Sequence, residues 1–142
     1  MLEELQLVTP ATQCQLEFDH SHFDPVTLVL SSGETFGVFD RWGDVQNIGQ
    51  RLQGIFHQGM RFLSRYELRV FGRRPFLLSS TIREDNDILL ADLSNPRLEL
   101  EGEILKEGSL HLQRIKMMRV GLMLESLAVK NYTHKPIELT FT

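Results

Sequence analysis

The sequence predicts an all-β domain, a twisted antiparallel β-sandwich, and two observations support this prediction. First, short segments alternate polar and apolar residues with period two, so that one side of each segment faces water and the other faces a core. In residues 65–70, three charged residues alternate with Tyr66, Leu68 and Val70. Second, turn-forming residues such as those of Ser31-Ser-Gly-Glu34 separate these segments at short intervals. Both features are typical of sandwiches and barrels of short strands.

The expected strands follow from this alternation and from the turn signals that bound them. In chain order they are residues 26–30, 35–39, 65–70, 76–79, 88–93, 97–104, 127–130 and 137–141. In residues 97–104 the pattern points Leu98, Leu100 and Ile104 inward. Residues 44–55 lack strand character, and Gly49 and Gly54 disfavour a long helix there.

The same alternation predicts which apolar residues form the core. The expected core residues are Leu28, Leu30, Phe36, Val38, Leu68, Val70, Leu77, Leu89, Leu98, Leu100, Leu110, Leu112, Leu122, Leu127, Val129, Ile137 and Leu139.

The length of 142 residues suits one principal domain with one core. Residues 1–25 are loosely patterned, and residues 26–142 carry the strand pattern of the sandwich. Because the sequence stops directly after an alternating segment, we expect the domain to be incomplete at its C-terminus and to belong to a larger protein.

Composition excludes several classes of partner. The formal net charge of −4 disfavours a nucleic-acid partner, since phosphate contacts usually need a basic surface. The sequence has no apolar run long enough for a membrane helix and no secretory signal pattern at Met1. Cys14 is the single cysteine, which excludes an intrachain disulfide and favours a reducing compartment. We therefore expect a cytoplasmic protein.

Several motifs in the same order resemble a known family. They are Leu28-Val-Leu-Ser-Ser-Gly-Glu-Thr-Phe-Gly-Val-Phe-Asp-Arg-Trp-Gly-Asp44, Gly54-Ile-Phe-His-Gln-Gly-Met-Arg-Phe-Leu-Ser-Arg-Tyr-Glu-Leu-Arg-Val-Phe-Gly72, Arg73-Arg-Pro-Phe-Leu-Leu-Ser-Ser80 and, in residues 125–136, Lys130-Asn-Tyr132. Together they are similar to the N-terminal domain of glycogen debranching enzymes of the bacterial amylo-alpha-1,6-glucosidase type. The similarity runs from about Val26 to the C-terminus.

The resemblance implies a β-sandwich that precedes a helical, toroidal catalytic domain hydrolysing α-glucosidic bonds. The catalytic carboxylates of the family lie in that second domain, so the resemblance assigns no catalytic residue to this chain and no cofactor. Gly59 and Met60 stand where family members often have an acidic residue and a threonine. This departure argues against substrate contact by that loop.

Two acidic residues and a tryptophan form the candidate substrate-binding set: Trp42, Asp40 and Asp44. An exposed tryptophan ring can stack on the flat face of a sugar, although the ring can equally plug the end of the sandwich or an interdomain surface. Asp40 and Asp44 lie in a predicted turn, where carboxylates cap the backbone. We expect both to be exposed to water and to have unperturbed pKa values, which disfavours catalysis.

Arginines gather on one segment and form the candidate domain interface, together with two aromatic residues. This set consists of Arg61, Arg65, Arg69, Tyr66 and Phe62. Arginine suits interfacial pairing with carboxylates, so this surface is expected to meet the helical domain or, in the isolated chain, a second copy. The alternative is local pairing of Arg65 and Arg69 with Glu67.

No motif indicates a metal site or a nucleophile. His20 and His22 supply only half of the ligands that a metal needs, and the other histidines form no triad at recognisable spacing.

The sequence therefore predicts a non-catalytic accessory domain of a debranching-type glycoside hydrolase, which packs on the catalytic domain and shapes glucan access. The alternative is an autonomous carbohydrate-binding module that uses Trp42.

Overall fold

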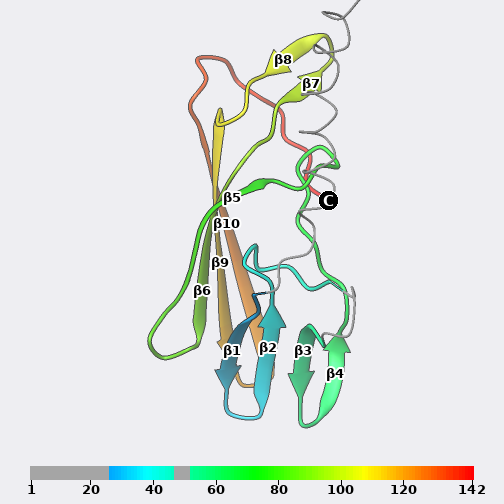
Figure 1. Ribbon diagram of the computed structural model, residues 1–142, viewed down its shortest axis with the longest axis vertical. Coiled ribbons are helices and arrows are strands. Elements are labelled where there is room, and N and C mark those ends of the chain that lie inside the picture. The colour runs from blue at the N-terminus through cyan, green and yellow to red at the C-terminus, as the bar shows by residue number, and fades with distance from the viewer. Residues whose placement is uncertain (1–25, 47–51) are drawn as a thin grey trace, which may run out of the picture.

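The structure is a computed structural model that describes residues 26–46 and 52–142 (Figure 1). The expectations for residues 1–25, including Cys14, His20 and His22, lie outside the described residues, as does Gly49.

The described residues form two four-stranded antiparallel sheets and a separate hairpin. The first sheet, in the order β1-β2-β3-β4, contains β1 (Leu28–Ser32), β2 (Thr35–Phe39), β3 (Gly54–His57) and β4 (Met60–Leu63). The second, in the order β10-β9-β6-β5, contains β5 (Phe76–Ile82), β6 (Ile88–Ser94), β9 (Leu110–Arg119) and β10 (Leu122–Asn131). The hairpin joins β7 (Leu98–Leu100) to β8 (Glu103–Leu105). The all-β sandwich is thereby confirmed.

The two sheets meet where β1 and β2 pack on β9, and the hairpin lies at the opposite end of the long strands (Figure 1). The buried apolar core is made of Leu30, Phe39, Val45, Val70, Leu89, Ala91, Leu93, Leu98, Leu105, Leu110, Leu112 and Met118. Six of the expected core residues are in this cluster: Leu30, Val70, Leu89, Leu98, Leu110 and Leu112. A further group packs against it while partly exposed: Leu28, Leu68, Leu77, Leu100, Leu127, Ile137 and Leu139.

The inward face of β2 is the reverse of the expected one. Phe36 is exposed and Val38 only partly buried, whereas Phe39 is fully buried. Gly37 makes room for this arrangement, because a Cβ there would lie 2.5 Å from the Phe39 ring. Phe36 instead stacks on Phe56 of β3, with 4.7 Å between the ring centroids.

Two more expected core residues are wrong, both on β10. Leu122 is exposed because it is on the outward face of the strand, opposite in parity to Leu127, and Val129 is exposed near the end of the strand, where no residue is buried.

Residues 65–70 and 137–141 are extended but are not regular strands. Their backbone groups bond to several different partners: Tyr66 to Val45, and Arg69 to Thr142 in both directions. Without a continuous ladder on one neighbour, only isolated bridges such as that between Val70 and Phe141 form.

Residues 97–104 are two strands where one was expected. Glu101 and Gly102 both have positive φ and turn the chain between β7 and β8. Ile104 consequently lies in the second strand and is exposed, contrary to the expectation.

None of the described residues is helical, and so no helix in that part of the chain could cross a membrane. In the stretch expected to lack strand character, Val45 is bridged to Tyr66, and the expectation is wrong at Gly54 and Ile55, which begin β3.

Candidate functional site

Asp40 and Asp44 lie in the loop that follows β2, and both are buried, with exposed fractions of 3% and 1%. The expectation of water-exposed carboxylates is therefore wrong. Their role as turn caps is confirmed for Asp40, whose Oδ1 accepts hydrogen bonds from the backbone N–H groups of Trp42 (3.0 Å) and Asp44 (2.9 Å). Asp44 instead reaches across the loop, and its Oδ1 accepts a hydrogen bond from Leu68 N–H at 3.0 Å.

Arg74 bridges the two carboxylates. Its Nη2 pairs with Asp40 and lies 2.9 Å from Asp44 Oδ2, and its Nε lies 3.1 Å from the same oxygen. The guanidinium carbon also lies 4.1 Å from the centre of the Trp42 ring. The indole N–H of Trp42 donates to the Pro75 carbonyl at 2.9 Å, so this partly buried tryptophan is held by a cation on its ring and a hydrogen bond at its nitrogen.

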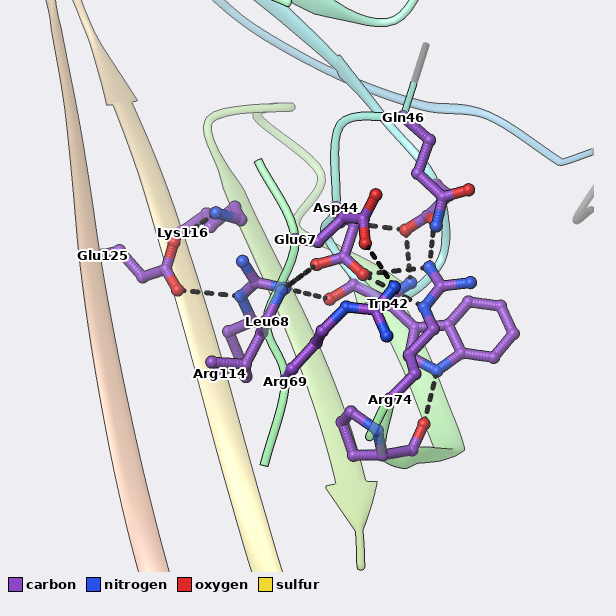
Figure 2. A network of polar contacts seen from close by, with 12 residues as sticks. Trp42, Asp44, Gln46, Glu67, Leu68, Arg69, Arg74, Arg114, Lys116 and Glu125 are labelled. Carbon is purple, nitrogen blue, oxygen red and sulfur yellow. Dashed lines mark hydrogen bonds and ion pairs between the residues drawn. The ribbon is translucent and has the colours of Figure 1, made fainter. Parts of the chain in front are cut away.

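The second sheet supplies the other half of the cluster from β9 and β10 (Figure 2). Arg114 and Lys116 are fully buried on the inward face of β9. Arg114 pairs with Asp44 and, through Nε at 2.8 Å, with Glu125 of β10, and it donates to the Trp42 carbonyl at 3.0 Å. Lys116 pairs with the other oxygen of Glu125. We call Asp40, Asp44, Arg74, Arg114, Lys116 and Glu125 the buried charge cluster.

Burial and mutual contact perturb the groups of this cluster. Burial, reinforced by the neighbouring Asp44 charge, raises the pKa of Asp40 to about 6. Burial, reinforced by Arg114, lowers the pKa of Lys116 to about 8. Burial also opposes the charge of Glu125, but Arg114 and Lys116 together hold its pKa below the ordinary value. Three carboxylates thus face three cations, which balances the formal charge.

The geometry suits a structural role. Each carboxylate is bound by at least one cation, and the Asp44–Arg114 pair joins the loop after β2 to the second sheet. Gly43 lets the loop approach closely, since its φ is +78° and a Cβ there would lie 3.1 Å from Cε of Lys116. No group of three or more histidine, cysteine or acidic residues in the described ranges is placed to hold a metal ion.

The candidate interface residues do not form one set. Arg65 and Arg69 pair locally with Glu67 at 3.4 and 2.9 Å, as the alternative expectation had it. The Tyr66 ring lies beside the buried charge cluster, its centre 4.4 Å from Nζ of Lys116.

On β4, Arg61 and Phe62 differ in exposure. Arg61 is half-buried and donates to the Gln53 carbonyl. Phe62 projects outward with 65% of its surface exposed.

Sequence reasoning missed Arg114, Lys116 and Glu125. The available signal was strand parity: Arg114 and Lys116 alternate with polar and apolar neighbours in the same phase as Leu110 and Leu112. That phase would place the two cations inside, opposite an inward carboxylate on the next strand.

Comparison with known proteins identifies the family of this chain. The model of the N-terminal domain of some glycogen debranching enzymes matches residues 30–142. The chain belongs to this family. The match spans both sheets of the debranching-enzyme domain, from Leu30 on β1 to Thr142, and includes every member of the buried charge cluster. No curated protein and no solved structure gave a significant match to this debranching-enzyme domain.

Proposed function

We propose that this chain is the non-catalytic N-terminal domain of a glycogen-debranching-type glycoside hydrolase, packing on a helical catalytic domain of the same cytoplasmic polypeptide and shaping glucan access. The observation that carries the proposal is the family match over residues 30–142. The burial of Asp40 and Asp44 supports the absence of catalysis, and exposed apolar side chains on β4 support docking on another domain.

The buried carboxylates support the absence of catalysis. Glycoside hydrolysis needs two carboxyl groups that reach the glycosidic bond, one as acid and one as nucleophile or base. Asp40 and Asp44 are both almost inaccessible, and both bind Arg74. Although the pKa of Asp40 is raised towards that of a general acid, a sugar oxygen could reach the carboxyl only by displacing these contacts.

Exposed apolar side chains on β4 support the docking surface. Met60 and Phe62 are each 65% exposed, and because they are two residues apart on β4 they lie on the same face of the strand. Two large exposed apolar side chains on one face are suited to a protein surface that covers them.

The test uses this chain and the helical catalytic domain as two separate polypeptides in a calorimetric titration. We expect binding, and we expect Phe62→Asp to weaken it about tenfold or more. Leu78→Asp is the matched control, because Leu78 is 61% exposed but lies on β5 of the other sheet. Absence of binding by the wild-type chain would overturn the docking part of the proposal.

The absence of catalysis is tested separately. The chain alone should release no sugar from a branched α-glucan. Sugar release that disappears in Asp44→Asn would contradict this part of the proposal.

A further inference from the structure

Among the described residues, the second sheet ends at a long unpaired edge, strand β10. The two sheets have four edge strands among the described residues: β1, β4, β5 and β10. β10 has ten residues and pairs with β9 in an unbroken register from Leu122 to Asn131. Within the described ranges, no backbone group of β10 has a backbone partner on the side away from β9. Such an edge is a template for another strand.

The other three edges carry features that discourage strand pairing. On β1, the N–H of Ser31 is already taken by the Asn86 carbonyl at 2.8 Å. β4 has only four residues, and β5 is interrupted by an irregularity between Leu77 and Ser79. β10 has no bulge, and its register is continuous.

The side chains of β10 also favour pairing. Leu122 and Leu124 are about half exposed, at 50% and 49%. Charges often protect edge strands, but the carboxylate of Glu125 turns inward and is neutralised by Arg114 and Lys116. Lys130, near the end of the strand, is the remaining charged residue of β10.

We propose that β10 pairs antiparallel with β10 of a second copy of this chain, about a two-fold axis centred on Ser126. This pairing joins the two four-stranded sheets into one continuous sheet. A strand and its own copy have the same length, so nearly every free backbone group on the edge gains a partner.

The side chains select this register. With Ser126 on the axis, Met123 faces Val129 and Leu124 faces Ala128, and no like charges are opposed. Shifting the axis to Leu127 would instead place Met123 opposite Asn131 and Leu124 opposite Lys130, which separates the apolar pairs. The pairing is independent of the docking surface on β4, which belongs to the other sheet.

The first experiment measures the mass of the chain by sedimentation over a wide concentration range. We expect a reversible dimer, and Ser126→Lys should raise its dissociation constant about tenfold or more, because two lysines would meet on the axis. Thr81→Lys is the matched control, since Thr81 is an exposed residue of the opposite edge strand, β5. A wild-type chain that stays monomeric, or equal effects of the two lysines, would overturn the proposal.

The second experiment tests the register. In a Cys14→Ser background, Ser126→Cys should form an intermolecular disulfide under mild oxidation, whereas Thr81→Cys should not. Equal cross-linking by both variants would contradict pairing through β10. Thermal unfolding of each variant, followed by circular dichroism, checks that the fold is retained.

Discussion

Lys116 of β9 lies directly opposite Glu125 of β10 in the strand register, and its buried amino group pairs with the Glu125 carboxylate. Glu125 is also bound by Arg114, so one carboxylate is paired with two buried cations on a neighbouring strand. Taking charges out of water is costly, and the cost is offset only when each charge keeps its partner. The inward face of β9 therefore depends on a residue of β10.

Glu125→Gln should strongly destabilise the domain. The substitution leaves Lys116 without its partner and deprives Arg114 of one of its two carboxylates. We expect a loss of about 3 kcal/mol in the free energy of unfolding, measured by chemical denaturation. The control is Glu103→Gln, which breaks an exposed pair with Lys135 and should cost no more than about 0.5 kcal/mol. Similar losses in both variants would contradict the importance of burial.

Asp40 should make stability depend on pH near neutrality. Burial raises its pKa in the folded state to about 6 from 3.8, so the folded chain binds this proton more tightly than the unfolded chain does. The resulting contribution to the free energy of unfolding is fully present below pH 3.8 and is lost as the pH rises through 6. Between about pH 5 and about pH 7 the wild type should lose about 1 kcal/mol more than Asp40→Asn.

Denaturation of both proteins at each pH checks this prediction. Titration of the histidines is common to the two proteins and cancels in the difference. Parallel pH profiles would show that Asp40 does not titrate in this range.

Gly43→Ala should destabilise the domain more than Gly108→Ala. Both glycines have similar positive φ values, +78° and +75°, so the backbone strain of the two substitutions is comparable. A Cβ at Gly43 meets the Lys116 side chain at 3.1 Å, whereas one at Gly108 has nothing within 4 Å. We expect the difference in the free energy of unfolding to be about 1 kcal/mol. If the two variants had equal stability to heat and to denaturant, the loop after β2 would be able to move away from Lys116 without cost.

Trp42 provides a test of glucan binding. The proposed accessory role predicts that maltooligosaccharides leave the fluorescence of this single tryptophan unchanged, because Arg74 and Pro75 already occupy its ring and its N–H group. An autonomous carbohydrate-binding module would instead give a saturable change. A saturable change in the fluorescence of Trp42 would therefore favour the alternative function.

Turn-forming residues predicted the sheet strands well where one neighbour pairs along the whole segment, as for β2 and β6. Period-two alternation failed for residues 65–70, whose backbone bonds to Val45, to the Asp44 carboxylate and to Thr142 in turn. Those partners are distant in the sequence, and local alternation carries no information about them.

The orientation of β2 and the buried charge cluster were missed for a related reason. Phe36 and Phe39 are the same residue type, so the sequence alone does not choose between them, and the space that Gly37 leaves for Phe39 exists only in the folded sandwich. Charge likewise argued against placing Arg114 inside, and only the nearby Asp44 and Glu125 make that placement favourable. Both outcomes depend on contacts between strands that no single segment reveals.

We infer that the buried carboxylates hold the two sheets together. A double-mutant cycle on Asp44 and Arg114 tests it most directly, using Asp44→Asn, Arg114→Met and the double variant in denaturant unfolding. We predict a coupling energy of about 2 kcal/mol or more between the two positions. Additive losses, within about 0.5 kcal/mol, would show that the loop after β2 and strand β9 are held by other contacts and would contradict the account.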